Sequence, residues 1–344
     1  MSKGALRPFI VPIFIPHQGC PHHCVFCEQQ KITSHPRRLL GARQVQDILN
    51  RAICSKGFNP NRRPLVAFYG GTFTGLPLSR MQELLGAVSP YLTKKLFYSI
   101  RVSTRPDAID DERLRLMKEA GVDTVELGVQ SMDNHVLELS ERGHSVEDSV
   151  RAVRRIKKHG LKVGIQLMPG LPGDSPECFR STVTQVVSLR PDLVRLYPTV
   201  VIQGTKLHSL YREGRYRPMT LVEALNICIE SCIHFEEKII KVIRIGLMSS
   251  PSLTAKDQIV AGPWHPSFGQ MVRSGVYRHT IEPQLPIPGS QADIRILVSK
   301  QDVHLLRGYK NEGLAWLQEK TGTPNIRIQL DDSLPTGRIR IERE

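Results

Sequence analysis

The sequence has few cysteines, few aromatic residues and no long apolar run. Seven of its 344 residues are cysteine and two are tryptophan. No apolar run approaches the ~20 residues needed to cross a bilayer. The run FIVPIFI at residues 9–15 is short, contains Pro12 and lacks a small-residue cleavage site, so no signal peptide is expected. We therefore expect a cytoplasmic protein, in which clustered thiols hold metal more often than they form disulfides.

Acidic residues are scarce at the start of the chain. The net charge is +14, and residues 1–64 contain ten Lys or Arg against two acidic residues. A high isoelectric point alone would indicate only a solvated basic surface, but a cluster beside a candidate active site favours a polyanionic substrate, nucleic acid above all. The basic residues of the segment 31–63 are Lys31, Arg37, Arg38, Arg43, Arg51, Lys56, Arg62 and Arg63.

Strand patterns alternate with helix patterns over the first two hundred residues. One helix pattern begins at Ser145, which has the spacing of a capping box with Asp148, and ends at Gly160. Six consecutive strand–helix units indicate an α/β fold with a parallel sheet, either wound open or curled into a barrel. The strands are predicted at 9–15, 65–71, 97–103, 124–130, 162–168 and 193–201.

Three of the cysteines lie close together in the segment QGCPHHCVFCEQQ: Cys20, Cys24 and Cys27. They would share one face of a helix, but Pro21 and the neighbouring histidines argue against a buried helix. A structural zinc site needs four ligands, and His22 or His23 could supply the fourth. An iron–sulfur cluster also uses thiolates at this kind of spacing, and three thiolates leave one iron open. The spacing alone does not distinguish zinc from an iron–sulfur cluster.

Polar residues and glycines follow the predicted strands, at the edge where ligands bind in parallel α/β sheets. Gly70 and Gly71 follow the second strand, where a tight turn is the common reason for paired glycines and close approach to a ligand is another. Glu126 and Gln130 are four residues apart on the fourth strand and share one face, and a buried glutamate is unusual for a core.

The C-x3-C-x2-C motif with Phe26 before its last cysteine, after the first strand of such a fold, resembles the radical S-adenosylmethionine superfamily over roughly residues 9–205. The resemblance implies a partial (β/α)6 barrel and a [4Fe–4S] cluster held by Cys20, Cys24 and Cys27. In this family S-adenosylmethionine chelates the fourth iron and is cleaved reductively to a 5′-deoxyadenosyl radical. An electron donor of the flavodoxin or ferredoxin type is then a required partner.

The resemblance also implies where S-adenosylmethionine binds. Gly70, Gly71 and Thr72 match the motif that meets its amine, and Arg105 is expected to pair with its carboxylate. Glu126 is expected at its methionyl or ribose part. The cofactor-binding residues predicted in this way are Phe26, Gly70, Gly71, Thr72, Thr104, Arg105, Glu126, Gln130, Gln166 and Met168.

Within the superfamily, the segments STRPDAID, ELGVQSMDNHVL, RGH (142–144) and QLMPGLPGD resemble the catalytic subunit of Elongator. They are also similar, less closely, to oxygen-independent coproporphyrinogen oxidases. The Elongator subunit modifies wobble uridines, which implies a tRNA or other RNA substrate. Its first cysteine gap is wider, and its acetyl-CoA signature has no match here, so carboxymethylation is not expected.

Two units are predicted: a barrel core over residues 8–205 and a C-terminal α/β extension over 206–344, whose tail from about residue 290 reads β-α-β-β. Arg-rich strands of this tail and the basic segment 31–63 are the expected RNA contacts. Two other functions stay open. One is a radical oxidase or transferase acting on a small molecule such as a porphyrinogen, and the other is a zinc or iron–sulfur RNA-binding module without radical chemistry.

Overall fold

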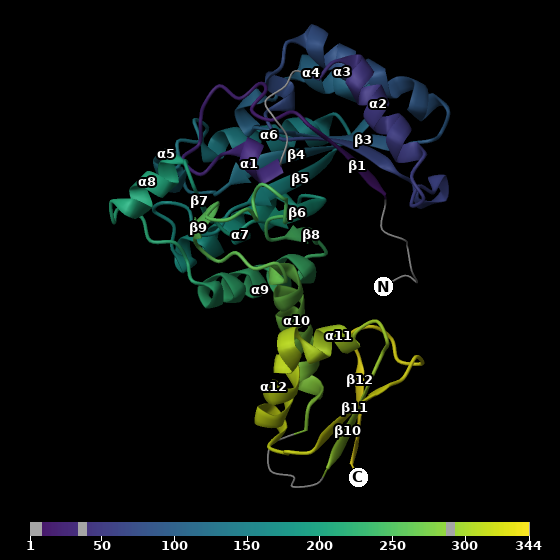
Figure 1. The fold of residues 1–344 in the computed structure, drawn as a ribbon, viewed down its shortest axis with the longest axis vertical. Helices are drawn as coiled ribbons and strands as arrows, with labels where there is room; N and C mark the ends of the chain where they lie inside the picture. The colour runs from purple at the N-terminus through teal and green to yellow at the C-terminus, as the bar shows by residue number, and fades with distance from the viewer. Residues whose placement is uncertain (1–8, 34–39, 287–292, 344) are drawn as a thin grey trace.

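A seven-stranded parallel sheet forms the upper part of the molecule in Figure 1. The structure is a computed structural model and describes residues 9–33, 40–286 and 293–343. Neighbouring strands follow the order β1-β2-β3-β4-β5-β6-β8. The predicted partial barrel is confirmed, with one strand more than the six expected. The strands are β1 (Ile10–Phe14), β2 (Leu65–Tyr69), β3 (Ser99–Thr104), β4 (Val122–Gln130), β5 (Lys162–Leu167), β6 (Leu193–Leu196) and β8 (Lys241–Ile245).

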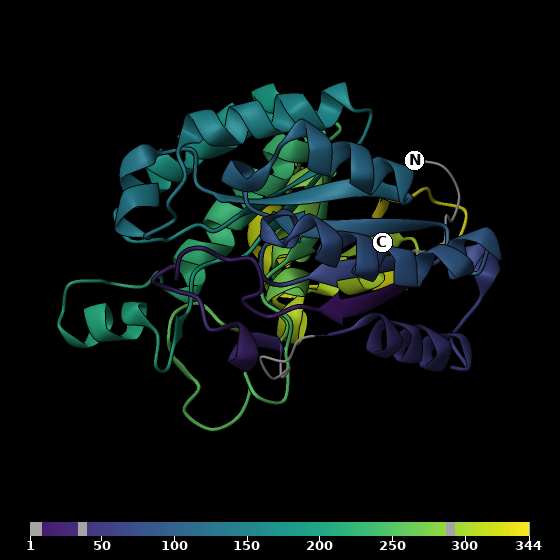
Figure 2. The same ribbon diagram turned by 90° about the horizontal axis from the view of Figure 1, so that it is seen from above.

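Six helices connect these strands and pack against the sheet. They are α2 (Ala42–Ile53), α3 (Leu78–Thr93), α4 (Asp111–Glu119), α6 (Val146–Lys158), α7 (Pro176–Leu189) and α9 (Leu221–Glu237). Figure 2 shows helices on the outer side of the curled sheet. Side chains such as Phe68, Leu84 and Val153 form one apolar core between the two layers. The capping box predicted for α6 is present, with Ser145 as the N-cap. No helix in the described residues is long and apolar enough to cross a membrane.

The region after residue 193 differs from the predicted single long strand. β6 ends at Leu196, and the chain forms a separate short strand, β7 (Val201–Ile202), which pairs with β9 (Ile259–Ala261) in a second sheet. β8, which lies beyond the boundary predicted at residue 205, pairs with β6 and becomes the edge of the main sheet. A pattern of apolar residues predicts that a segment forms a strand, but it does not predict the strand with which that segment pairs.

A smaller C-terminal unit lies below the sheet in Figure 1 and is joined to it by α10 (Phe268–Ile281). It contains β10 (Ile294–Val298), α11 (Val303–Arg307), α12 (Glu312–Thr321), β11 (Ile326–Leu330) and β12 (Ile339–Arg343). β10 is central, parallel to β11 and antiparallel to β12. One face of this sheet packs against α10 and α12 in its own apolar core, which includes Tyr277 and Leu317.

Three short helices lie among the loops that follow the strands of the main sheet. They are α1 (Gln29–Thr33), α5 (Asn134–Leu139) and α8 (Lys206–Arg212). In Figure 1, α5 and α8 lie at the left of the sheet and α1 lies nearer its middle. Because all seven strands are parallel, the loops after them share one rim, and this rim holds the candidate site.

Candidate functional site

The cysteine loop connects β1 to α1 and touches three other segments of the rim. The Cys20 Sγ lies 3.2 Å from the Thr72 Oγ1, in the loop after β2. The Arg142 Nη1 donates a hydrogen bond of 2.8 Å to the Cys24 Sγ from the connection between α5 and α6. The backbone of Val25 binds Ser140 and Leu207 on either side. The loop is therefore held by the ends of α5 and α8 as well as by its own turns.

The three thiols are close enough to influence one another electrostatically. Burial, together with the neighbouring thiols Cys24 and Cys20, raises the pKa of Cys27 to about 12. Burial also raises the pKa of Cys20. In the described part of the chain, no three Cys, His, Asp or Glu side chains come together in a group that could hold a single metal ion. The donor set fits an iron–sulfur cluster, because three cysteine thiolates on one loop can each bind a different iron.

Glycines allow the cysteine loop and the loop after β2 to pack closely. Gly71 has φ +58°, and a Cβ on it would lie 2.3 Å from the Gln18 carbonyl oxygen. Gly19 has φ +73°, and a Cβ there would lie 2.2 Å from the Thr72 carbonyl oxygen. The Gln29 Oε1 accepts from the backbone of Gly71, and also of His17, at 2.7 Å. Loop-to-loop packing thus requires glycine at position 71.

Phe26 is a further residue of the cysteine loop. It packs in a small apolar cluster with Val25, Val201, Leu207 and Tyr216. This cluster joins the loop to α8 and β7. The structure therefore gives Phe26 an anchoring contact within the protein.

Two buried arginines lie beside the thiols. Arg105 is paired with Asp107 through two hydrogen bonds of 3.0 and 3.1 Å, and it also donates to the Arg142 carbonyl. Arg142 is 5% exposed and binds the Cys24 sulfur and the Gly128 carbonyl. Among the described residues, no carboxylate lies within ion-pair distance of Arg142. This cation is available for an anionic ligand, whereas the charge of Arg105 is already neutralised.

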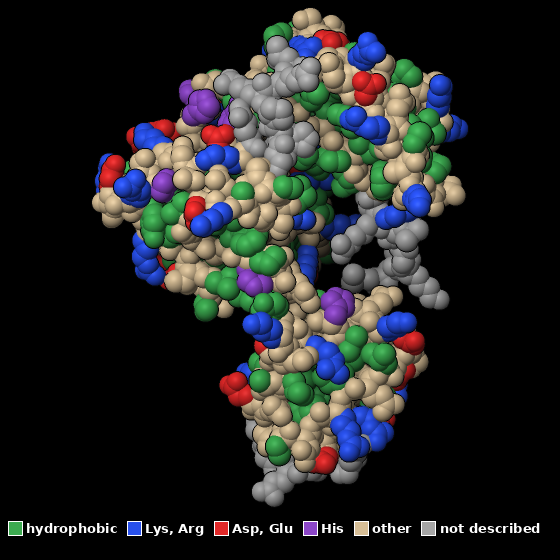
Figure 3. Space-filling model, viewed as in Figure 1, with side chains coloured by type: hydrophobic (Ala, Val, Ile, Leu, Met, Phe, Trp, Pro, Cys, Tyr) green, Lys and Arg blue, Asp and Glu red, His purple; other side chains and the backbone are tan. Residues whose placement is uncertain are grey.

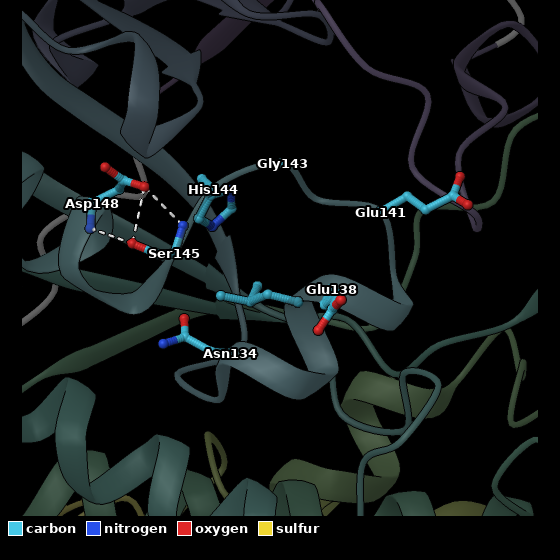
Figure 4. A pocket seen from close by; sticks show the side chains of 8 residues that line it. Asn134, Glu138, Glu141, Gly143, His144, Ser145 and Asp148 are labelled. Atoms are coloured by element: carbon cyan, nitrogen blue, oxygen red, sulfur yellow. Dashed lines mark hydrogen bonds between the residues drawn. The ribbon is translucent and has the colours of Figure 1, made fainter.

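The connection that carries Arg142 is fixed by α6. Figure 4 shows Ser145 and Asp148 joined by the hydrogen bonds of the capping box, with His144 beside them. These residues line a surface pocket of about 590 Å³. His144 is buried, and burial, followed by the charges of Arg142 and Arg105, lowers its pKa to about 3. A neutral His144 therefore adds no charge beside Arg142.

Gly143 brings the same connection against the cysteine loop. A Cβ on Gly143 would lie 2.4 Å from the ring of His22. Residues 142–144 belong to a segment that resembles the catalytic subunit of Elongator, but no role was predicted for Arg142. An arginine next to a glycine, in the short connection between two helices that follow a strand of the sheet, is the signal that could have found it.

Glu126 lies on the inner face of the sheet between two arginines. The Arg101 Nη1 is 2.9 Å from one carboxylate oxygen, and the Arg195 Nε is 3.0 Å from the other. Glu126 is 5% exposed, and a Cβ on Gly164 would lie 2.9 Å from its Cγ, so glycine makes room for it. The prediction places Glu126 against the cofactor, and the structure places it in an ion-pair network.

The remaining predicted residues lie together at the ends of β3, β4 and β5. The Gln166 Nε2 donates to the Gln130 Oε1 at 3.1 Å, and the Met168 backbone donates to the Gln130 carbonyl at 2.9 Å. Thr104 faces Thr74, with 2.5 Å between the hydroxyl oxygens. The sequence thus identified residues that do converge on the rim, although several contact one another rather than stand free.

A parallel half-barrel with a three-cysteine loop at the end of its first strand defines a class of enzymes. The chain matches the Radical SAM superfamily over residues 14–186 and the Radical_SAM C-terminal domain over residues 191–278. It belongs to the radical SAM superfamily and is a radical SAM enzyme. The predicted resemblance to this superfamily is confirmed.

Relatives within the superfamily are similar to parts of the chain. A tRNA uridine(34) acetyltransferase of Methanocaldococcus infernus is 40% identical over 129 residues, which are 37% of this chain and 24% of that protein. Elongator complex protein 3 of Mus musculus is 33% identical over 180 residues, 45% of this chain and 32% of that protein. The chain thus spans about a quarter to a third of the length of these curated relatives.

A solved structure shows the same fold over most of the chain. The archaeal Methanocaldococcus infernus Elp3 with an N-terminus deletion aligns with a TM-score of 0.60 and 23% identity. The alignment covers 81% of this chain and 63% of that chain. The Elongator-like arrangement of the barrel, expected from the sequence, is therefore confirmed at the level of the fold.

Proposed function

We propose that this protein uses a [4Fe–4S] cluster and S-adenosylmethionine to modify a uridine in tRNA. The observation that carries the proposal is the loop with three thiols beside Arg142 at the rim of the half-barrel. Cys20, Cys24 and Cys27 would hold the cluster. The two cofactors would supply a hydrogen-abstracting radical, with the electron coming from a flavodoxin- or ferredoxin-type donor.

The residues around the loop support binding of S-adenosylmethionine. Its carboxylate needs a cation, and Arg142 meets that need better than Arg105, which already pairs with Asp107. The amides of Gln130 and Gln166, which bind each other at 3.1 Å, suit the hydroxyls of a ribose. Gly70, Gly71 and Thr72 would offer backbone groups to the amine.

Two observations support a tRNA substrate. The first is the similarity of the chain, 40% identical over 129 residues, to a tRNA uridine(34) acetyltransferase. The second is the basic charge of the chain, which totals +14. Basic side chains would contact phosphates and position a base over the site. The small-molecule alternative predicts that tRNA has no effect on turnover.

The cofactor part of the proposal is tested by anaerobic reconstitution. The protein should bind four irons and four sulfides and release 5′-deoxyadenosine from S-adenosylmethionine when dithionite is added. Replacing Cys20, Cys24 and Cys27 by Ala should abolish both. A matched variant with Cys54→Ala and Cys178→Ala, which changes cysteines outside the loop, should retain both. Tight zinc binding without 5′-deoxyadenosine would support the structural-zinc alternative and contradict the proposal.

The substrate part is tested with bulk tRNA added to the same reaction. We expect tRNA to stimulate formation of 5′-deoxyadenosine and nucleoside analysis to show a changed uridine. If the protein cleaves S-adenosylmethionine but tRNA neither stimulates the reaction nor changes, the tRNA substrate is wrong and the radical chemistry still stands.

A further inference from the structure

One guanidinium on the inner face of the sheet organises two tyrosine hydroxyls. The Arg195 Nη1 donates to the Tyr197 hydroxyl at 3.1 Å, and the Nη2 donates to the Tyr69 hydroxyl at 2.6 Å. The Arg195 Nε lies 3.0 Å from Glu126. The two terminal nitrogens of the guanidinium therefore each hold one phenol oxygen, and the rigid fork fixes both oxygens relative to one another.

Both hydroxyls keep a hydrogen to donate. A phenol oxygen that accepts from arginine still carries its own O–H. Within the described ranges, neither Tyr69 nor Tyr197 donates to a protein acceptor. Burial, together with the nearby Glu126, raises the pKa of Tyr69, so its hydroxyl stays protonated at neutral pH. The pair therefore offers two donors.

The position of the pair connects it with the candidate cofactor site. Tyr69 is the last residue of β2 and directly precedes Gly70, and Tyr197 follows the end of β6. Both side chains are half-buried. Figure 3 shows a hollow at the centre of the face it presents, with Lys or Arg side chains inside it. The two donors thus lie at the level of the rim, next to the loop after β2.

The charge around the pair favours an acceptor over a donor as ligand. Glu126 lies between Arg101 and Arg195, so one carboxylate faces two guanidinium groups. The network carries a net positive charge, which attracts oxygen atoms with partial or full negative charge.

We propose that Tyr69 and Tyr197, held by Arg195, bind the substrate by donating hydrogen bonds to two of its oxygen atoms. In a uridine these oxygens are the two carbonyls of the base, which would hold the ring in the barrel with another edge facing the cofactor. This inference rests on the proposed function and adds to it the residues that recognise the base.

The test uses Tyr69→Phe, Tyr197→Phe and the double variant in the reconstituted protein, with bulk tRNA as the probe. Each change removes one neutral donor, and kcat/KM for tRNA should fall roughly 3- to 10-fold per hydroxyl. The KM for S-adenosylmethionine should stay unchanged. Tyr91→Phe is the matched control, because the Tyr91 hydroxyl binds Asn50 at 2.8 Å in the helix layer and has no role at the rim.

Each outcome decides the matter. A fall in kcat/KM for tRNA in the Tyr69 and Tyr197 variants, with unchanged Tm and unchanged KM for S-adenosylmethionine, supports the inference. It is overturned if wild-type protein modifies tRNA and the double variant does so equally well. It is also overturned if Tm and turnover fall while both KM values rise, since that pattern indicates a structural role. If wild-type protein does not act on tRNA at all, the proposed substrate fails and this inference fails with it.

Discussion

At the scale of single residues, we expect substitutions of the two arginines beside the thiols to have different effects, one on cofactor binding and the other on stability. Arg142→Gln removes a buried cation that no described carboxylate neutralises, so S-adenosylmethionine should bind roughly 10- to 100-fold more weakly, the loss expected for a charge-assisted hydrogen bond. Arg105→Gln leaves Asp107 without its partner and should lower Tm instead. Equilibrium binding and thermal unfolding of both variants check this. If Arg105→Gln loses more affinity for S-adenosylmethionine than Arg142→Gln does, Arg105 is the residue that pairs with the cofactor carboxylate, as the sequence predicted.

The sequence identified residues whose neighbours are close in the chain and missed those whose partners are distant. Cys20, Cys24 and Cys27 could be found because their spacing is local. Arg142 is 118 positions from the Cys24 sulfur to which it donates, and Arg195 is 126 positions from Tyr69. Such contacts depend on the order of strands in the sheet, which no local pattern specifies.

At the scale of secondary-structure elements, the loop after β2 depends on the absence of a side chain at position 71. Gly71→Ala should be strongly destabilising, because the added Cβ would lie 2.3 Å and 2.6 Å from the carbonyl oxygens of Gln18 and Ile15, and because φ is +58°. The iron content should fall with it, since the cysteine loop packs on this turn. Urea unfolding and iron analysis check both effects.

A second glycine provides the control for that experiment. Gly86 lies on the exposed side of α3, and an added Cβ would meet nothing within 4 Å. Gly86→Ala should therefore stabilise the protein by about 1 kcal/mol, the helix-propensity difference between the two residues, with no loss of iron. If the two variants behave alike, the packing account of Gly71 is wrong.

The elements themselves were largely predictable, and the exceptions have a common cause. The predicted strand 162–168 corresponds to β5 within one residue, because a buried parallel strand is a short apolar run. The predicted strand 193–201 is divided between two sheets, and β8, which lies beyond the boundary predicted at residue 205, joins the main sheet. Burial gives the strands of the main sheet and those of the second sheet a similar apolar composition. The sheet that a strand joins therefore depends on tertiary pairing.

At the scale of the whole molecule, the two basic regions proposed to contact RNA lie far apart. Figure 1 places α2 near one end of the long axis and the sheet of β10, β11 and β12 near the other. Arg43 and Arg51 are exposed on α2, while Arg37 and Arg38 lie outside the described residues. In the C-terminal sheet Arg295 is opposite Arg327 across the parallel pair, and Arg340 is opposite Leu297. A single ligand can contact both regions only if it is as long as the molecule.

A tRNA that spans the molecule should lose contacts when either end is changed. We expect Arg43→Gln with Arg51→Gln, and separately Arg327→Gln with Arg340→Gln, to weaken tRNA binding and to reduce the slope of log Kd against log salt by up to about two each. The effect of the second pair should be the smaller one, since Arg340 lies 3.4 Å from the acidic Asp331.

The matched control is Lys94→Gln with Lys95→Gln. These exposed lysines precede β3, at the end opposite the rim, and their replacement should leave the slope unchanged. Binding titrations at several salt concentrations measure all three. If the slope changes in only one of the two arginine variants, the RNA contacts only that end of the molecule. If all three variants change the slope equally, the basic residues at the two ends make no specific contact with tRNA.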